Sequence, residues 1–272
     1  KGLIERRQGK WNEAIKDQER SAQLDPRNVR YAIDLCRSLT ITRHYPEARG
    51  VCERVIPLAP DRPDGYTGLS NLILLSTGDV NKAVAILRQA KRQVDPDLLR
   101  GVLSLGWPAL TDPEFRRDME KALSAKDDQN RMSFLVWSLT FSVYTKNKPA
   151  QLAYADSLIA EAPKAMRGNF LDATVHALLG EAYAAKGDRQ RSLEEGNLSL
   201  QTTPLSADAL GSSNNLVVIA YNAVLAGSYD EAITYLEQLL AIPSYVSVPQ
   251  LRVDPWFDPL RGNPRFERLL AR

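Results

Sequence analysis

The sequence predicts an all-α protein, folded as a right-handed α–α superhelix of stacked helix pairs with a cap at its C-terminal end. Three observations predict this architecture. A short motif recurs along the chain, a proline follows each copy at a nearly constant distance, and the first three copies recur at intervals of 34 and 35 residues. Repeats of about this length form stacked units of two helices, in which each pair buries its apolar face against its neighbours.

The motif combines a turn residue with the start of a helix. Its copies stand at residues 9–14 (GKWNEA), 43–48 (RHYPEA), 78–83 (GDVNKA), 187–192 (GDRQRS) and 227–232 (GSYDEA). The interval from Ala14 to Ala48 is 48 − 14 = 34, and the closing prolines Pro26 and Pro60 repeat it, 60 − 26 = 34. The glycine predicts a positive φ in the turn, and the proline predicts the end of the second helix.

Residues 170–204 resemble a tetratricopeptide repeat (TPR). The sequence HxxLGxxY at 176–183 stands where the family has WxxLGxxY, a small residue follows at Ser192, and Pro204 closes the repeat. His176 in place of tryptophan is the departure from the pattern. The resemblance implies antiparallel helix pairs, with the first helix of each pair lining a concave surface that binds other proteins.

Two short segments carry a second resemblance, to C-terminal regions of bacterial signalling proteins that begin with a kinase, cyclase or winged-helix domain. These segments are residues 6–11 (RRQGKW) and 251–260 (LRVDPWFDPL). The chain contains no kinase, cyclase or winged-helix motif, so the resemblance carries no such activity over. It does imply a parent protein with further domains, and a first residue other than Met agrees with that expectation.

The pattern divides the chain into four parts. Residues 1–96 are expected to hold N-terminal TPR repeats, the first of them truncated, and residues 97–128 an irregular helical hairpin in which Asp112 caps a helix that starts at Pro113. Residues 129–243 are expected to hold C-terminal repeats, the first degenerate. Residues 244–272 form the predicted cap, in which Trp256, Phe257, Leu260 and Phe266 cover the last open face; the alternative makes Trp256 and Phe257 a partner-binding loop.

Small residues are expected where the two helices of a pair approach, such as Gly180 with Ser192 and Cys36 with Ala48. Cys36 and Cys52 lie on the two helices of one pair. Buried free thiols are the favoured interpretation. A disulfide is the alternative if the protein is exported.

Composition argues against several classes of protein. The net charge is only +2, from 35 basic and 33 acidic residues, and the two signs alternate along the helices. Nucleic-acid binding is therefore not expected, and no apolar run approaches the length of a membrane span. We expect a cytoplasmic location, or an extracytoplasmic one if the parent protein carries an N-terminal membrane helix.

The chain shows no motif of a catalytic, cofactor or metal site. Gly-x-Ser-x-Gly and phosphate-binding glycine loops are absent, His176 is expected in the core and His44 in an exposed turn. We therefore expect no enzyme activity, no cofactor and no metal. A regulatory domain that binds a small ligand or its own parent enzyme is the alternative function, and an enzyme with a hidden site is less favoured.

A protein or peptide partner is expected in the concave TPR groove. The groove residues share exposed positions on the predicted first helices, and with only Arg30 and Arg37 as cationic donors they favour an apolar helix or extended peptide over a carboxylate ligand. Trp137, Tyr144 and Tyr221 are the expected anchors, with the alternative that half of the set is core. The groove set is Arg30, Ile33, Arg37, Leu72, Trp137, Thr140, Tyr144, Glu181, Tyr221 and Asn222.

Overall fold

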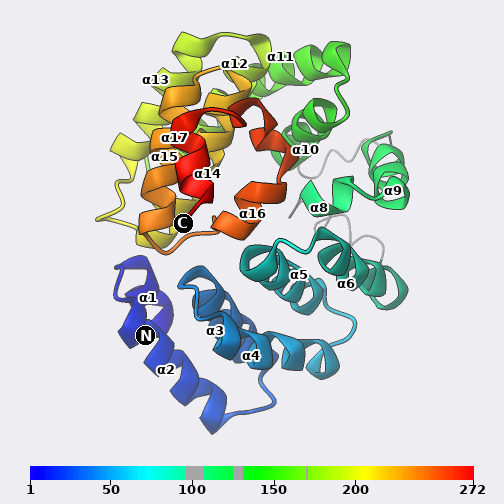
Figure 1. The fold of residues 1–272 in the computed structure, drawn as a ribbon, viewed down its shortest axis with the longest axis vertical. Coiled ribbons are helices and arrows are strands. Elements are labelled where there is room, and N and C mark those ends of the chain that lie inside the picture. The colour runs from blue at the N-terminus through cyan, green and yellow to red at the C-terminus, as the bar shows by residue number, and fades with distance from the viewer. Residues whose placement is uncertain (96–106, 125–130, 170) are drawn as a thin grey trace. The chain divides into compact units, whose positions relative to one another are not determined.

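The computed structural model describes residues 1–95, 107–124, 131–169 and 171–272, and all the regular elements in these ranges are helical (Figure 1). The contacts divide the chain into two compact units. Unit 1 comprises Lys1–Ala122 and Pro243–Val253, and unit 2 comprises Leu123–Ile242 and Asp254–Arg272. The predicted cap, residues 244–272, is thus shared between the two units.

Unit 1 contains three consecutive helix pairs. These are α1 (Gly2–Arg7) with α2 (Trp11–Leu24), α3 (Val29–Ile41) with α4 (Tyr45–Leu58), and α5 (Pro63–Thr77) with α6 (Val80–Gln93). The short α8 (Trp107–Leu110) contacts α6, α9 (Pro113–Ser124) follows it, and α16 (Val248–Val253) packs on α5.

Unit 2 contains three further pairs. These are α10 (Arg131–Tyr144) with α11 (Lys148–Ala165), α12 (Asp172–Lys186) with α13 (Arg189–Thr202), and α14 (Ala209–Leu225) with α15 (Tyr229–Ala241). The 3₁₀ helix η2 (Pro255–Leu260) contacts α14, and α17 (Pro264–Leu270) contacts α15. Of the four residues predicted to cover this end of the repeat, Phe257, Leu260 and Phe266 are fully buried and Trp256 is partly buried.

The turn between the helices of a pair has one backbone signature. Gly9, Gly78, Gly187 and Gly227 all have positive φ, between 69° and 81°, two residues before the second helix begins. Arg43 (φ 63°) and Lys146 (φ 54°) take the same position in the two pairs that lack the glycine, α3–α4 and α10–α11. The left-handed turn residue is therefore kept where the sequence motif has eroded.

Side-chain caps fix the helix starts. Asp79, Asn147 and Asp188 each accept a hydrogen bond from the backbone N–H three residues on, at 3.0 to 3.2 Å. Asp112 accepts from the backbone of Glu114 at 2.7 Å, which confirms it as the cap of α9. Each cap satisfies an N–H that has no partner within its helix.

The two helices of a pair approach each other closely at small residues, as predicted for Gly180 and Ser192. A Cβ added at Gly180 would lie 3.2 Å from the carbonyl oxygen of Ser192. The hydroxyl of Ser70 donates to the carbonyl of Ala83 at 3.0 Å across the α5–α6 pair. The helices of the α12–α13 and α5–α6 pairs therefore approach closely at these positions, which larger side chains there would prevent.

Cys36 and Cys52 form a disulfide between α3 and α4, with Cα atoms 5.1 Å apart. The expectation of two free thiols was wrong. The reason is geometric, because the small-residue seam that draws α3 towards α4 also brings the two Cα atoms within the range that a disulfide requires.

Candidate partner-binding site

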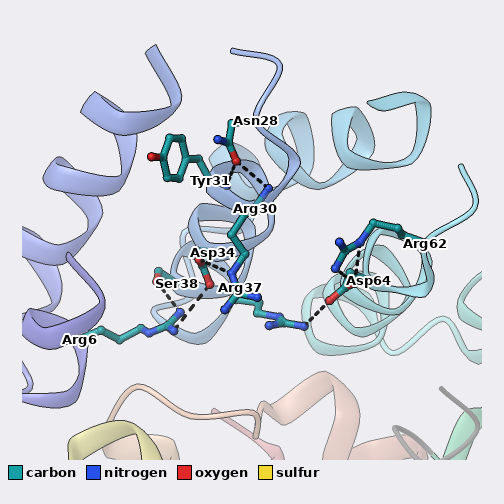
Figure 2. A network of polar contacts seen from close by, with 9 residues as sticks. All are labelled: Arg6, Asn28, Arg30, Tyr31, Asp34, Arg37, Ser38, Arg62 and Asp64. Atoms are coloured by element: carbon teal, nitrogen blue, oxygen red, sulfur yellow. Dashed lines mark hydrogen bonds and ion pairs between the residues drawn. The ribbon is translucent and has the colours of Figure 1, made fainter. Parts of the chain in front are cut away.

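A network of arginine and aspartate side chains lies on the first helices of the pairs in unit 1 (Figure 2). Asp64, at the start of α5, receives two of these arginines. Arg37 of α3 donates from Nη2 to its Oδ1 at 2.9 Å, and Arg62 donates from Nη2 to its Oδ2 at 2.9 Å. The Arg37–Asp64 pair thereby links α3 to α5.

Asp34, one turn before Ser38 on α3, is the second acceptor of the network. Arg30 donates from Nε to its Oδ2 at 3.0 Å, and Nη2 of Arg6 lies 3.9 Å from its Oδ1. Arg6 also donates from Nη1 to the hydroxyl of Ser38 at 3.3 Å, which links α1 to α3. Asp34 is only 5 % exposed, so its charge is held where water screens it little.

The positive charge of Arg6 is only partly compensated, although its side chain is largely buried. Burial lowers the pKa of its guanidinium, and the charge of Asp34 acts in the opposite direction. Its buried Nε has no hydrogen-bond partner among the described residues, and neither has Oδ1 of Asp34. A buried guanidinium N–H without an acceptor is unfavourable, so this position favours an additional acceptor.

The network carries more positive than negative charge. It contains the four arginines Arg6, Arg30, Arg37 and Arg62 and two aspartates, a difference of 4 − 2 = 2. Three of these arginines remain accessible, since the side chains of Arg30, Arg37 and Arg62 are 64 %, 38 % and 50 % exposed. This side of unit 1 therefore presents a locally cationic surface.

The segment Pro243–Val253 adds a phenol to this region of unit 1. The backbone N–H of Ser244 donates to the carbonyl of Ile41 at 3.2 Å, and Nη2 of Arg43 donates to the carbonyl of Val246 at 3.2 Å. Burial raises the pKa of Tyr245, which lies between these anchors, and the charges of Arg37 and Arg6 oppose that rise. The phenol is therefore within electrostatic reach of both guanidinium groups.

Unit 2 holds a buried carboxyl group on its inner helices. Oε1 of Glu181 in α12 accepts a hydrogen bond from the hydroxyl of Thr140 in α10 at 2.7 Å. Removal from water raises the pKa of Glu181 to about 7, although the Thr140 hydrogen bond opposes the shift.

Unit 2 also contains a cluster of aromatic side chains around Trp256. Trp256 lies with its ring centroid 5.0 Å from that of Tyr144 and 5.3 Å from that of Tyr221. Its indole Nε1 donates to the carbonyl of Tyr221 at 2.9 Å, and the hydroxyl of Tyr221 donates to Asp254. Trp256 thus packs against two of the predicted anchors.

The predicted groove residues fall into three groups. Ile33, Leu72, Glu181 and Asn222 are buried, contrary to the expectation that they line a surface. Ile33 packs with Ala32 and Val55, because this side of α3 faces its partner helix rather than solvent. Arg30 and Arg37 lie in the accessible network, and the partly buried members are Trp137, Thr140, Tyr144 and Tyr221.

Sequence reasoning missed several members of the arginine–aspartate network of unit 1 and the phenol near it: Arg6, Asp34, Arg62, Asp64 and Tyr245. Asp34 follows Arg30 by one helical turn, so the i,i+4 spacing was a signal for that pair. Arg37 and Asp64 are 27 residues apart. No local spacing connects them, or either of them to Tyr245.

Two kinds of site are absent from the part of the chain that the structure describes. No helix there combines the length and the apolar character that a membrane crossing requires. No group of three or more histidine, cysteine or acidic side chains there is arranged to hold a metal ion.

No protein-family model and no curated protein sequence matches the chain. A tetratricopeptide repeat protein from Parabacteroides merdae ATCC 43184 matches with a TM-score of 0.50 and 12 % identity, over 94 % of this chain and 96 % of that one.

Two other solved structures show weaker likeness. A chain of the APC/C hetero-tetramer Cut9–Hcn1 has 14 % identity and a TM-score of 0.49 over 99 % of this chain, which spans only 47 % of that chain's length. The TPR domain of P58(IPK) has 11 % identity and a TM-score of 0.32, over 99 % of this chain and 61 % of that one. The Parabacteroides likeness shows the fold alone: the chain is an all-α, TPR-like repeat of helix pairs, as predicted.

Proposed function

We propose that the chain is an interaction module that binds a segment of a partner protein on the first helices of unit 1, and that it has no catalytic activity of its own. The observation that carries the proposal is the accessible arginine set on α3 and at the start of α5, formed by Arg30, Arg37 and Arg62. Arginine is enriched in protein interfaces because its guanidinium makes several directed hydrogen bonds and also packs on apolar groups.

The repeat architecture supports a binding role. Stacked helix pairs present a long row of first helices, and such rows serve as extended interaction surfaces. The aromatic anchors expected in unit 2 are weaker candidates for the binding surface. Trp256 packs against Tyr144 and Tyr221 and so occupies one side of both rings. We therefore place the partner on unit 1 rather than on those aromatics.

The setting of the module is also a proposal. A larger bacterial signalling protein rests on the two short resemblances at residues 6–11 and 251–260 alone. The Cys36–Cys52 disulfide supports the extracytoplasmic alternative over the cytoplasm, because such bonds persist in oxidising compartments and are rare in the cytosol.

A displayed peptide library tests the proposal directly. The full chain is immobilised and panned, and the enriched peptides are then measured against the triple variant Arg30→Gln, Arg37→Gln, Arg62→Gln. Arg49→Gln, an exposed arginine on α4 outside the network, is the matched control. Peptides that bind the chain and the control but not the triple variant support the proposal.

The library experiment also contains its own refutation. If no peptide is enriched, or if the enriched peptides bind the triple variant as well as they bind the chain, the assigned surface is wrong. Trp137→Ala then tests the partly buried tryptophan of α10 as the alternative contact in unit 2. Circular dichroism of each variant establishes that the helices are intact.

A further inference from the structure

Three segments of unit 1 carry side chains that interact electrostatically near the partly compensated guanidinium of Arg6. Arg6 comes from α1, Arg37 from α3, and Tyr245 from the segment Pro243–Val253. We propose that these three side chains form a composite site for an oxyanion, a phosphate or carboxylate group carried by a side chain of the partner segment. The inference rests on the proposed function and specifies the chemistry of the ligand.

The charge balance is the first argument. Asp34 is shared between Arg30 and Arg6, and Asp64 is shared between Arg37 and Arg62, so four cations have two anions. The sharing is also unequal. Arg30 lies 3.0 Å from Asp34 but Arg6 lies 3.9 Å from it, and the positive charge left over is therefore concentrated near Arg6.

Unused donors are the second argument. Arg6 has a buried Nε without an acceptor among the described residues, and the hydrogen bond shown for Arg37 uses Nη2 alone. A guanidinium presents five N–H donors in a planar fork, which fits the paired oxygens of a carboxylate or a phosphate. Figure 2 shows Arg6 reaching Asp34 and Ser38 from α1, while Arg37 extends from α3 toward Asp64.

The approach to the site is through Arg37. Arg6 is 11 % exposed in its side chain and Arg37 is 38 % exposed, so an incoming group meets Arg37 first. It competes there with Asp64, and deeper with Asp34, for the same N–H groups. Binding is consequently expected to weaken strongly with salt, and a group with two negative charges is expected to compete better than one with a single charge.

A phosphate group matches the two surplus positive charges of the arginine–aspartate network more closely than a carboxylate group does. A phosphorylated serine carries about −1.5 to −2 charges near neutral pH and has three acceptor oxygens, against a surplus of 4 − 2 = 2 positive charges. One glutamate supplies half of that charge. We therefore expect phosphoserine to bind more tightly than a pair of glutamates, which must be positioned together.

Backbone contacts hold Tyr245 in this site. Its neighbour Ser244 donates to the carbonyl of Ile41, and Arg43 donates to the carbonyl of Val246 on its other side. Arg43 is 203 residues from Val246 in the sequence, so long-range contacts of this segment place the phenol where the charges of Arg37 and Arg6 act on it. The Tyr245 hydroxyl supplies the neutral donor of the site.

The test uses fluorescein-labelled peptides with one Gly/Ser/Ala backbone and different central residues: phosphoserine, Glu-Glu, Ser-Ser or Lys-Lys. Binding to the full chain is measured by fluorescence anisotropy at about 50 mM and about 200 mM salt. The variants are Arg6→Gln, Arg37→Gln and Tyr245→Phe, and Arg49→Gln is the control.

Phosphoserine is expected to bind most tightly, Glu-Glu next, and the other two not at all. Arg37→Gln is expected to weaken phosphoserine binding about tenfold or more, as for the loss of a charge-assisted hydrogen bond, and Tyr245→Phe about threefold. Arg49→Gln should change neither affinity. If Arg6→Gln unfolds the chain, the more exposed Arg37 and the conservative Tyr245→Phe still decide the outcome.

Two results overturn the inference. In the first, neither anionic peptide binds the chain. In the second, both peptides bind Arg37→Gln and Tyr245→Phe as tightly as they bind the unchanged chain. The proposed function fails separately, in the library experiment. Library peptides that are lost in the triple variant but retained by Arg6→Gln and Tyr245→Phe would leave an interaction module on unit 1 without an oxyanion site.

Discussion

Glu181→Gln is expected to stabilise unit 2 at neutral and alkaline pH. The carboxyl of Glu181 is buried between α10 and α12, and its pKa is raised from 4.5 to about 7. The shift is 7 − 4.5 = 2.5 units, and each unit corresponds to 1.36 kcal/mol, so ionisation of the folded protein costs about 3 kcal/mol.

The sign of the pH dependence follows from the direction of the shift. Between about pH 4.5 and pH 7 the unfolded chain has released this proton while the folded chain still holds it, so the contribution of Glu181 to stability falls as pH rises. Below that window and above it the contribution is constant. Glutamine stays neutral and keeps an oxygen that accepts from Thr140, so the variant avoids the loss.

The assay is urea unfolding followed by tryptophan fluorescence at a series of pH values between about 4.5 and 8. The free energy of unfolding of Glu181→Gln should exceed that of the wild type by an amount that grows to about 3 kcal/mol at pH 7 and above. Glu194→Gln, at an exposed site on α13, is the control. Parallel pH curves for Glu181→Gln and the wild type would refute the reasoning.

Three further predictions concern stability. Reduction of the Cys36–Cys52 disulfide, which closes a loop of 16 residues, should lower the free energy of unfolding by about 3 kcal/mol in urea titrations with and without dithiothreitol. Gly78→Ala should lower the free energy of unfolding by at least about 2 kcal/mol, and Gly187→Ala should lower it by about 1 kcal/mol. Both glycines have positive φ, but a Cβ at Gly78 would lie 2.7 Å from a carbonyl oxygen while Gly187 has open space. Equal losses of stability in thermal melts would contradict this. Lys146→Gly should stabilise by about 1 kcal/mol in the same melts, since glycine relieves the strain of φ 54°, and a loss of stability would show that the turn is not strained.

Repeat periodicity predicted the helix pairs because their packing is local. The motif predicted a helix shortly after each turn glycine, and α2, α6, α13 and α15 begin two residues after it. The degenerate pair α10–α11 was recognisable from its first helix, and the structure adds that Asn147 caps the second. These features depend on neighbouring residues, which a single sequence displays.

Burial on the first helices could not be predicted in the same way. A first helix contacts both its partner and the neighbouring pairs, so helical periodicity does not separate its one accessible side from its buried sides. Ile33 and Leu72 were therefore placed on a surface that they do not reach. Arg30 and Arg37 do lie on the accessible side, where each guanidinium stays in contact with water as well as with its aspartate partner.

Arg43 stands where the repeat usually has glycine, and it makes a long-range contact that the repeat pattern of the sequence could not predict. Arginine at a positive φ costs about 1 kcal/mol relative to glycine, and read along the sequence this residue is only an eroded glycine. In the fold its guanidinium lies 3.2 Å from the carbonyl oxygen of Val246 and 3.5 Å from the hydroxyl of Ser244. The hydrogen bond to Val246, with the longer contact to Ser244 beside it, is sufficient to offset that strain, since one hydrogen bond contributes about 1 kcal/mol. Since Gly78 meets Pro249 of the same segment, one turn that kept its glycine and one that lost it both serve to receive this segment.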